Sequence, residues 1–262
     1  MEPVGLAVGI ISLAGVFETA IHCFEYVHDG QNFSVQLQTS SLKLSDAQIR
    51  LSRWGKAVGL EAELTKDKAA LNKHFNGSNL QDARKRVNHI VQLFEEAKEQ
   101  SATYDTQAQS STKDTDERDP KISAVSLAMR RVSITRLKQS TTSKKVQWAV
   151  RKNRFNGLIE HITVLVKHLE ELFPAAAGER EALAAEEAKE LAPNKIVLQT
   201  LLRELGTAKQ EVQDKLLMDA LEARRQTERT APTVTSTFGN NNSGLQANQI
   251  KGGSFNWGAK SS

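Results

Sequence analysis

The sequence predicts an all-α protein with a single domain of about seven to nine helices, followed by a C-terminal tail of different composition. Apolar residues recur at spacings of three and four over most of the first 226 positions, which is typical of helices with one buried face. Aromatic residues make up only 5% of the chain and there are five prolines, which also favours helices over a β-sandwich. We expect a helical domain over residues 1–226 and a second region over 227–262.

The first predicted helix covers about residues 4–27 and is rich in apolar and small side chains. Its uncharged run, fifteen residues between Glu2 and Glu18, is shorter than the roughly 20 residues that a spanning helix needs. Gly5 and Gly9 are four apart, which allows close contact between helices. Two interpretations stay open: a buried or half-buried first helix, or a metastable helix that leaves the domain and enters a membrane. The candidate membrane-inserting residues are Val4, Gly5, Leu6, Gly9, Ile10, Leu13, Phe17, Ile21 and Phe24.

The next elements follow from periodicity and turn residues. An amphipathic helix is predicted over about 34–56, with Gly55 as its stop signal. Residues 59–77 are predicted as a short helix and a loop. Ser78 is the predicted N-cap of the next helix, which runs to about residue 97 and gives way to a polar loop.

The last helices carry the most regular apolar stripes. A basic helix is predicted over about 121–139, and a strongly periodic one over about 155–172 ends at Pro174. An Ala- and Glu-rich helix follows at about 175–191. One long amphipathic helix is predicted over about 194–226.

Charge is distributed unevenly although the net charge is only +4. Residues 121–155 hold ten Lys or Arg and no acidic residue, whereas residues 157–190 hold eight Glu and three Lys or Arg. The two blocks could pair with each other, the basic block could simply be a solvated face, or it could face phospholipid, nucleic acid or an acidic protein. Nucleic acid is the weaker alternative, since only Trp148 and Phe155 are available for stacking on bases. The candidate anionic-lipid contacts are Arg130, Arg131, Lys144, Lys145, Arg151 and Lys152.

No motif for catalysis or metal binding is found. The six histidines form no metal-binding motif, and the chain has neither a P-loop nor a nucleophile elbow. The single cysteine, Cys23, excludes an intramolecular disulfide and is predicted to be a buried, inert thiol in a reducing, intracellular compartment. We therefore expect no enzyme activity, no catalytic residue, no cofactor and no small-molecule substrate.

The tail after Arg229 has a composition suited to cross-β assembly. Its last 33 residues hold five Gly, five Asn, no acidic residue and two lysines. Identical side chains stack about 4.8 Å apart in such assemblies, so an uncharged segment escapes like-charge repulsion and Asn or Gln can form amide ladders. We expect this tail to be disordered in the monomer and to form amyloid through a core at about 237–257.

The helical region resembles the HeLo domain of the fungal HET-s/HET-S family. The resemblance rests on the stretches MEPVGLAVGIISLAGVFETAIHCFEYVHDGQ, RLSRWGKAV, KKVQWAV and VKHLEELFP, and it covers about residues 1–225. It implies an α-helical, cytosolic domain with membrane-disrupting, pore-forming cell-death activity. It also implies that the apolar N-terminal segment, here about 4–27, enters the membrane and that an amyloid region controls the domain.

The tail is similar to the sigma or pseudo-palindromic amyloid signalling motifs of fungal receptor–effector pairs. Gly244 to Ala247 fit a G-φ-Q-φ-G-like core shared with RHIM sequences, whereas Asn248 stands where Gly is usual. The candidate motif residues are Phe238, Gly239, Asn240, Asn241, Asn242, Gly244, Leu245, Gln246, Ala247, Asn248, Gln249, Ile250, Gly252, Gly253, Phe255 and Trp257.

Together these resemblances imply a fungal cell-death execution protein in a heterokaryon-incompatibility or innate-immunity response. Its expected partners are an NLR-type receptor with a matching motif, further copies of itself, and membrane lipid after activation. Its expected location is the cytoplasm at rest and the cell membrane when activated. Two alternatives stay open: a non-lytic amyloid-assembling adaptor, and a basic helical protein that binds nucleic acid.

Overall fold

The computed structural model describes residues 3–30, 35–60, 73–102, 119–137, 152–207 and 213–230, which form eight α-helices and one 3-10 turn. The predicted all-α class is therefore confirmed for the described part of the chain. The elements are α1 (Pro3–Gly30), α2 (Val35–Ala57), α4 (Gly77–Ala102), α5 (Pro120–Thr135), α6 (Lys152–Leu172), the turn η1 (Pro174–Ala176), α7 (Ala177–Leu191), α8 (Lys195–Gly206) and α9 (Lys215–Thr230).

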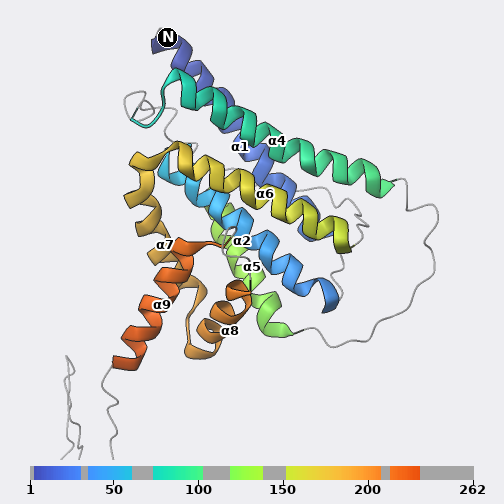
Figure 1. The fold of residues 1–262 in the computed structure, drawn as a ribbon, viewed down its shortest axis with the longest axis vertical. Helices are drawn as coiled ribbons and strands as arrows, with labels where there is room; N and C mark the ends of the chain where they lie inside the picture. Colours follow the sequence, from blue (N-terminus) through green and yellow to red (C-terminus); the bar gives the residue numbers. More distant parts are fainter. Residues whose placement is uncertain are drawn as a thin grey trace, which may run out of the picture.

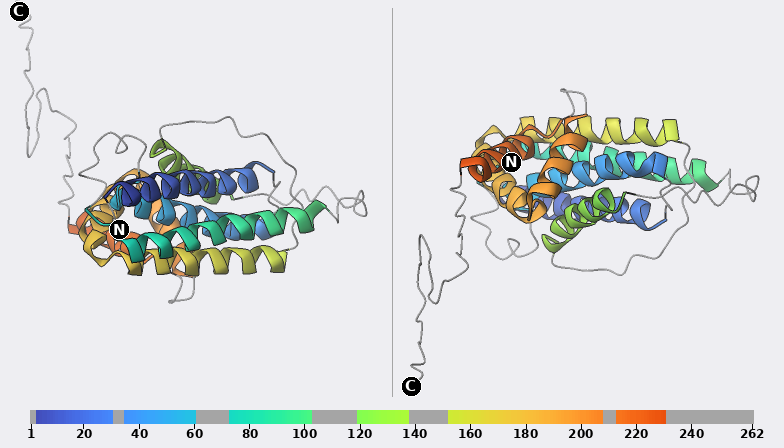
Figure 2. Two further views of the ribbon diagram at one scale, coloured as in Figure 1. Left: turned by 90° about the horizontal axis from the view of Figure 1, so that it is seen from above. Right: turned by 90° about the horizontal axis from the view of Figure 1, so that it is seen from below.

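Helix α2 lies in the middle of the domain and serves two hydrophobic cores (Figure 1; Figure 2). Leu44, Leu51 and Trp54 belong to a core shared with α1, α4 and α6. Leu42 and Ile49 belong to a second core shared with α5, α8, α9 and the end of α7. Because helices cover α2 on several sides, all of residues 44–55 are buried, polar side chains included.

The end of α2 differs from the prediction that Gly55 stops this helix. The helix continues to Ala57, and the chain turns at Gly59, which has a φ of 82° in the left-handed region that favours glycine. The amide of Leu60 donates to the carbonyl oxygen of Gly55 at 2.8 Å, which closes the turn. Gly55 serves packing instead, since its missing side chain leaves room for a ring from α1.

Helix α4 is capped by Asn76 and not by the predicted Ser78. The Asn76 Oδ1 atom accepts from the backbone amides of Ser78 and Asn79, both at 3.0 Å. Asn and Ser have similar N-cap preferences, so the local sequence allowed either position. Most of the short helix predicted at 59–77 lies outside the described residues.

The single long helix predicted for 194–226 is wrong, because the structure has two helices there. Helix α8 ends at Gly206, and α9 starts at Lys215 with Asp214 accepting a hydrogen bond from the Leu217 amide. The apolar spacing is helical on both sides of the break, so periodicity alone did not reveal it. The break lets α9 turn back and pack against α7 as well as α8.

The start of α1 and the end of α9 lie at opposite ends of the folded domain, as Figure 1 shows with α1 at the top and α9 at the lower left. Helix α1 lies at the surface, with α4 beside it and α2 beneath it (Figure 2). The first helix is therefore half covered, with one face toward the core.

Candidate functional site

The inner face of α1 forms part of the main hydrophobic core. Five of the candidate membrane-inserting residues are at most 4% exposed, namely Ile10, Leu13, Phe17, Ile21 and Phe24. Of the other candidates, Gly5 is exposed and Leu6 and Gly9 are half-buried, whereas the Val4 side chain lies outside the described part. Membrane entry of this helix therefore requires its inner face to leave the core.

Close contacts fix α1 against its two neighbours. The ring of Phe17 lies over Gly55 and packs edge-on against Trp54, with ring centroids 6.1 Å apart. Phe24 makes a similar contact with Phe94 of α4 at 4.9 Å. These contacts explain why a helix with several glycines is held in one position.

The outer face of α1 is exposed and uncharged up to Glu18, whose side chain is 40% exposed. Val8 is 62% exposed and Ile11 is 50% exposed, and they continue a stripe of small or apolar exposed residues through Gly5, Gly15 and Thr19. From Gly5 to His28, α1 is long and apolar enough to cross a membrane by length and composition, a test that core helices and signal sequences also pass. The helix thus exceeds the fifteen-residue uncharged run considered in the sequence, because it continues past Glu18.

Polar contacts hold the C-terminal third of α1. The carboxylate of Glu25 accepts two hydrogen bonds from Arg130 of α5, at 2.6 and 3.2 Å, and one from Gln48 of α2 at 2.8 Å. The His28 ring lies 3.3 Å from the Ser45 hydroxyl. Burial, and secondarily the nearby Arg130 charge, hold the pKa of His28 well below its usual range.

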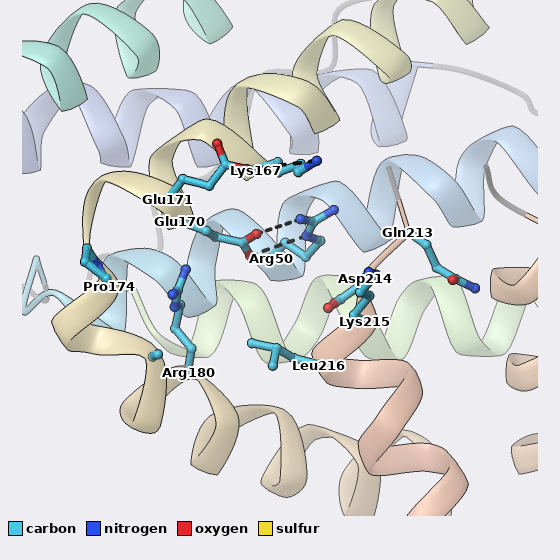
Figure 3. Close-up of a pocket in the computed structure, with 11 residues that line it drawn as sticks. Arg50, Lys167, Glu170, Glu171, Pro174, Arg180, Gln213, Asp214, Lys215 and Leu216 are labelled. Carbon is cyan, nitrogen blue, oxygen red and sulfur yellow. Dashed lines mark hydrogen bonds and ion pairs between the residues drawn. The ribbon is translucent and has the colours of Figure 1, made fainter. Parts of the chain in front are cut away.

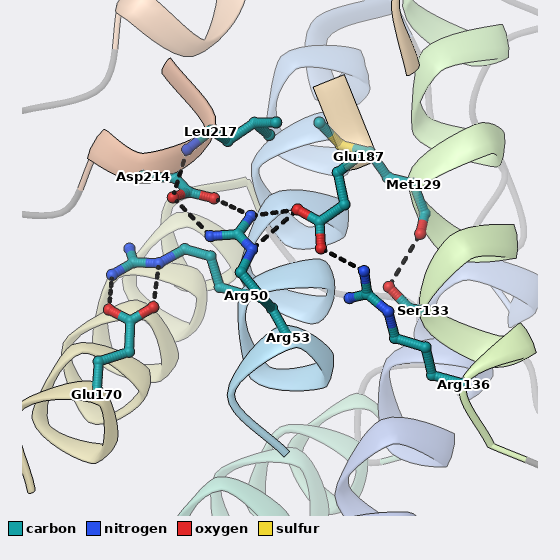
Figure 4. A network of polar contacts seen from close by, with 9 residues as sticks. All are labelled: Arg50, Arg53, Met129, Ser133, Arg136, Glu170, Glu187, Asp214 and Leu217. Carbon is teal, nitrogen blue, oxygen red and sulfur yellow. Dashed lines mark hydrogen bonds and ion pairs between the residues drawn. The ribbon is translucent and has the colours of Figure 1, made fainter. Parts of the chain in front are cut away.

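A buried ion-pair network joins α2 to the C-terminal helices (Figure 4). Arg53, with its side chain fully buried, donates to Glu187 of α7 and to Asp214 at the start of α9, at 2.6 to 3.0 Å. Glu187 also pairs with Arg136 at the end of α5 at 2.6 Å. One guanidinium thus links three helices, and loss of a partner would leave a buried charge unpaired.

A second ion pair and an orphaned carboxyl lie next to this network. Arg50 donates to Glu170 of α6 at 2.6 Å. Asp46 is buried and its Oδ1 atom makes no hydrogen bond within the described part of the chain. Burial, followed by the charge of Asp214, raises the pKa of Asp46 to about 8, so its neutral form predominates at neutral pH.

The basic block is partly used inside the fold. Arg136 pairs with Glu187, as the interpretation of two pairing blocks predicted, whereas Arg130 pairs with Glu25 of α1. Arg131 is exposed. The other candidate lipid contacts, Lys144, Lys145, Arg151 and the side chain of Lys152, lie outside the described part.

Two further predictions concern Cys23 and the tail. Cys23 is half-buried and not fully buried, yet burial, followed by the Glu95 charge, raises the pKa of its thiol to about 12. An inert thiol is therefore consistent with its position. The whole candidate amyloid core, residues 237–257, lies outside the described residues.

Sequence reasoning missed the buried charges of α2. Arg50 and Arg53 belonged to no predicted site, although each is at most 4% exposed. A signal was present in the stretch LSDAQIRLSRWG, where the two arginines lie between apolar residues on two sides of the helix. Their acidic partners are 120 to 161 positions away, which no local pattern can reveal.

These features define a class: an all-helical domain that carries a long apolar helix at its surface, anchors it through the Glu25–Arg130 ion pair, and joins α2 to the C-terminal helices by buried ion pairs. The family model of the HeLo domain, described as prion-inhibition and propagation, matches residues 5–201. The chain therefore belongs to the HeLo family.

Two curated relatives come from Podospora anserina. Heterokaryon incompatibility protein s is 31% identical and heterokaryon incompatibility protein S is 30% identical, each over 180 residues that make up 67% of this chain. The matched part spans 61% of the length of each relative. The similarity to these two proteins thus supports a common family for the helical part of this chain. The remaining part of each relative lies outside the match.

Solved structures agree with this assignment. The structure of the HET-s N-terminal domain matches with a TM-score of 0.65 and 26% identity, covering 83% of this chain and 98% of the solved chain. A mutant form of the same domain matches with a TM-score of 0.64. The expected HeLo fold is confirmed by these matches.

Proposed function

We propose that this chain is a fungal cell-death execution protein of the heterokaryon-incompatibility type, which acts by permeabilising a membrane and not by enzyme catalysis. The observation that carries the proposal is α1 itself, in a domain of the HeLo family. It combines the length and composition of a membrane-spanning helix with a position at the domain surface. The names of the two relatives, which are heterokaryon incompatibility proteins, support the same biological setting.

The proposed trigger is the C-terminal tail. A cytoplasmic NLR-type receptor that carries a matching motif would form an amyloid seed, and the segment around Gln246 would be templated onto it. Many helical domains tethered to one fibril reach a high local concentration. Crowding would then loosen α1, which enters the cell membrane, while cations of the basic block such as Arg131 attract anionic lipid.

The exposed stripe of α1 allows a test that leaves the core untouched. Ile11 is 50% exposed, so Ile11→Glu keeps the fold but places a charge in the helix that would enter the bilayer. Leu127 of α5 is 51% exposed, and Leu127→Glu is a matched control with the same chemistry outside α1. Dye release from liposomes by seeded full-length protein should fall strongly for Ile11→Glu and stay unchanged for Leu127→Glu.

Tail function is tested separately. Gln246→Lys stacks a charge at the proposed amyloid core and should abolish seeding, while the circular dichroism of the helical domain stays unchanged. Fibrillar, seeded parent protein that releases no dye would rule out the pore mechanism. Seeding that survives Gln246→Lys would rule out the tail as the trigger.

The non-lytic adaptor is the second candidate, and the tight packing of α1 favours it. The buried residues of α1, among them the five buried membrane-inserting candidates, and the Glu25–Arg130 pair must be released before the helix can leave. In an adaptor these contacts persist, the tail oligomerises, and the helical domain only recruits other proteins. Because deletion of residues 1–27 would also remove core residues such as Leu13 and Phe17, Ile11→Glu separates the two more cleanly: toxicity falls under the pore mechanism, whereas an adaptor keeps both its toxicity and its recruitment of other proteins.

A further inference from the structure

A pocket of about 600 Å³ opens between four elements on the side of the domain where α9 begins. Arg50 of α2, Glu170 of α6, Arg180 of α7 and Lys215 of α9 contribute to its wall (Figure 3). The pocket therefore lies where the last helix meets the rest of the domain, away from the exposed face of α1.

The wall of the pocket carries more cations than its own carboxylates neutralise. Four basic side chains line the pocket, one from each of four helices, and three acidic side chains line it as well. The basic residues are Arg50, Lys167, Arg180 and Lys215, and the acidic residues are Glu170, Glu171 and Asp214. Glu170 is bound to Arg50 at 2.6 Å, and Asp214 is bound to Arg53 at 2.7 Å. These two carboxylates are thus already occupied by arginines of α2.

Arg180 is a buried cation of this wall that has no partner among the described residues. It is only 8% exposed, yet it makes no ion pair or hydrogen bond within the described part of the chain, and its buried Nε–H group has no acceptor. Figure 3 shows its side chain extending from α7 toward the space near Arg50 and Glu170. Burial is the main cause that lowers the pKa of Arg180. The negative charge of Glu170 acts in the opposite direction, and the positive charges of Arg53 and Arg50 offset part of that effect. A buried guanidinium with unused donors costs free energy unless an acceptor fills the space.

Helix ends add to the positive potential of the pocket. Lys215 and Leu216, in the first turn of α9, line it, and so does Ala177, the first residue of α7. Helix α7 has no side-chain cap at its N-terminus. The helix dipole at such ends favours an anion, although the Ala177 amide already donates to the Pro174 carbonyl oxygen and the Asp214 carboxylate caps α9.

We propose that this pocket binds a phosphate group, with Arg180 as its main ligand and Lys215 and Lys167 at the rim. Phosphate suits the site because a guanidinium donates to two of its oxygens at once and because its double charge matches several cations. Bound there, it bridges α6, α7 and α9, and so it stabilises the docked position of the last helix. The phosphate can belong to a soluble molecule or to a lipid headgroup.

The test uses the full chain and two probes. Inorganic pyrophosphate stands for the soluble source: it should raise the melting temperature saturably, above the effect of sodium chloride at equal ionic strength. Phosphatidylcholine vesicles with and without phosphatidic acid stand for the lipid source, and co-sedimentation measures binding without the tail being seeded. A saturable response to either probe identifies the source, and no response to both overturns the proposal.

Matched variants decide whether the pocket is responsible. Arg180→Gln should weaken binding of the responding probe at least about tenfold, since it removes a charge-assisted bidentate contact. Lys215→Gln, at an exposed position, should weaken binding by a smaller factor and guards against misfolding of the first variant. Arg203→Gln removes an equally basic side chain that is 65% exposed on α8, outside the pocket wall. The proposal is overturned when Arg180→Gln and Lys215→Gln bind as the parent does, or when Arg203→Gln weakens binding as much as they do.

Discussion

The ring of Phe17 occupies the space that a side chain at position 55 would need: a Cβ on Gly55 would lie 2.2 Å from the Phe17 Cζ atom. Gly55→Ala must therefore move a ring that is 4% exposed and packed against Trp54. We expect the free energy of unfolding to fall by about 1–3 kcal/mol, measured by urea denaturation.

The control for this substitution is Gly157→Ala in α6. A Cβ at Gly157 would meet nothing within 4 Å, so the variant should gain roughly 0.5–1 kcal/mol from the better helix propensity of alanine. Equal losses in both variants would mean that the Phe17–Gly55 contact does not hold α1 in place.

The pair of Glu25 and Arg130 anchors the end of α1. Arg130→Met leaves a carboxylate whose side chain is 9% exposed and whose one remaining donor among the described residues is Gln48, so we expect a loss of about 3 kcal/mol in the free energy of unfolding. Arg131→Met changes the exposed neighbour and should cost less than about 0.5 kcal/mol. Denaturation curves of the two variants that coincide would contradict the anchoring role.

Asp214 connects α9 to the domain in two ways, as a partner of Arg53 and as the cap that accepts from the Leu217 amide. Asp214→Ala should therefore increase hydrogen exchange of the amides of α9 far more than that of α4. Asp219→Ala, at an exposed position of the same helix, should leave the exchange of α9 amides near that of the parent. Uniformly faster exchange over all helices would point to global destabilisation instead.

Asp46 makes stability depend on pH. Its pKa is about 8 in the folded protein against an ordinary value of 3.8, so the folded state keeps a proton that the unfolded chain releases between these values. The contribution of Asp46 to stability therefore falls as pH rises from about 4 to 8. Asp46→Asn should remove this slope and stabilise the protein at pH 8 by about 1–3 kcal/mol. Parent and variant with parallel pH profiles of unfolding would contradict the buried, neutral carboxyl.

Cys23 should resist alkylation in the folded protein. Its pKa of about 12, against an ordinary 9.0, makes the thiolate roughly a thousandfold scarcer at pH 8. Iodoacetamide labelling followed by mass spectrometry should thus be slow in buffer and fast in urea. Rapid labelling of the native protein would show that the thiol is reactive.

Local patterns predicted the helices well because each helix carries its own apolar stripe, and the stripe of α6 from Phe155 to Leu172 is the clearest case. They failed where tertiary contacts decide. Gly55 was predicted to end the helix, yet its role is to leave space for the ring of Phe17. The break between α8 and α9 depends on Asp214 reaching Arg53, which lies 161 positions earlier.

The candidate site was predicted in part for the same reason. The apolar residues of α1 follow one another closely in the sequence, so this helix could be predicted from the sequence. Glu25, Asp46 and Arg180 are ordinary charged residues in the sequence, and only the packing of helices from distant parts of the chain makes them buried and gives or denies them partners.

The opposite positions of the two helix ends set a direction for the proposed assembly. If the domain is tethered to a fibril through the residues after α9, the start of α1 would lie at the end of the domain that is farthest from the fibril axis. Helix α1 has 28 residues and is roughly 42 Å long, more than the hydrocarbon thickness of a bilayer. Domains arranged radially around a fibril would thus meet a lipid surface with their apolar ends first, and the fibril itself would stand off from the membrane by the length of the folded domain.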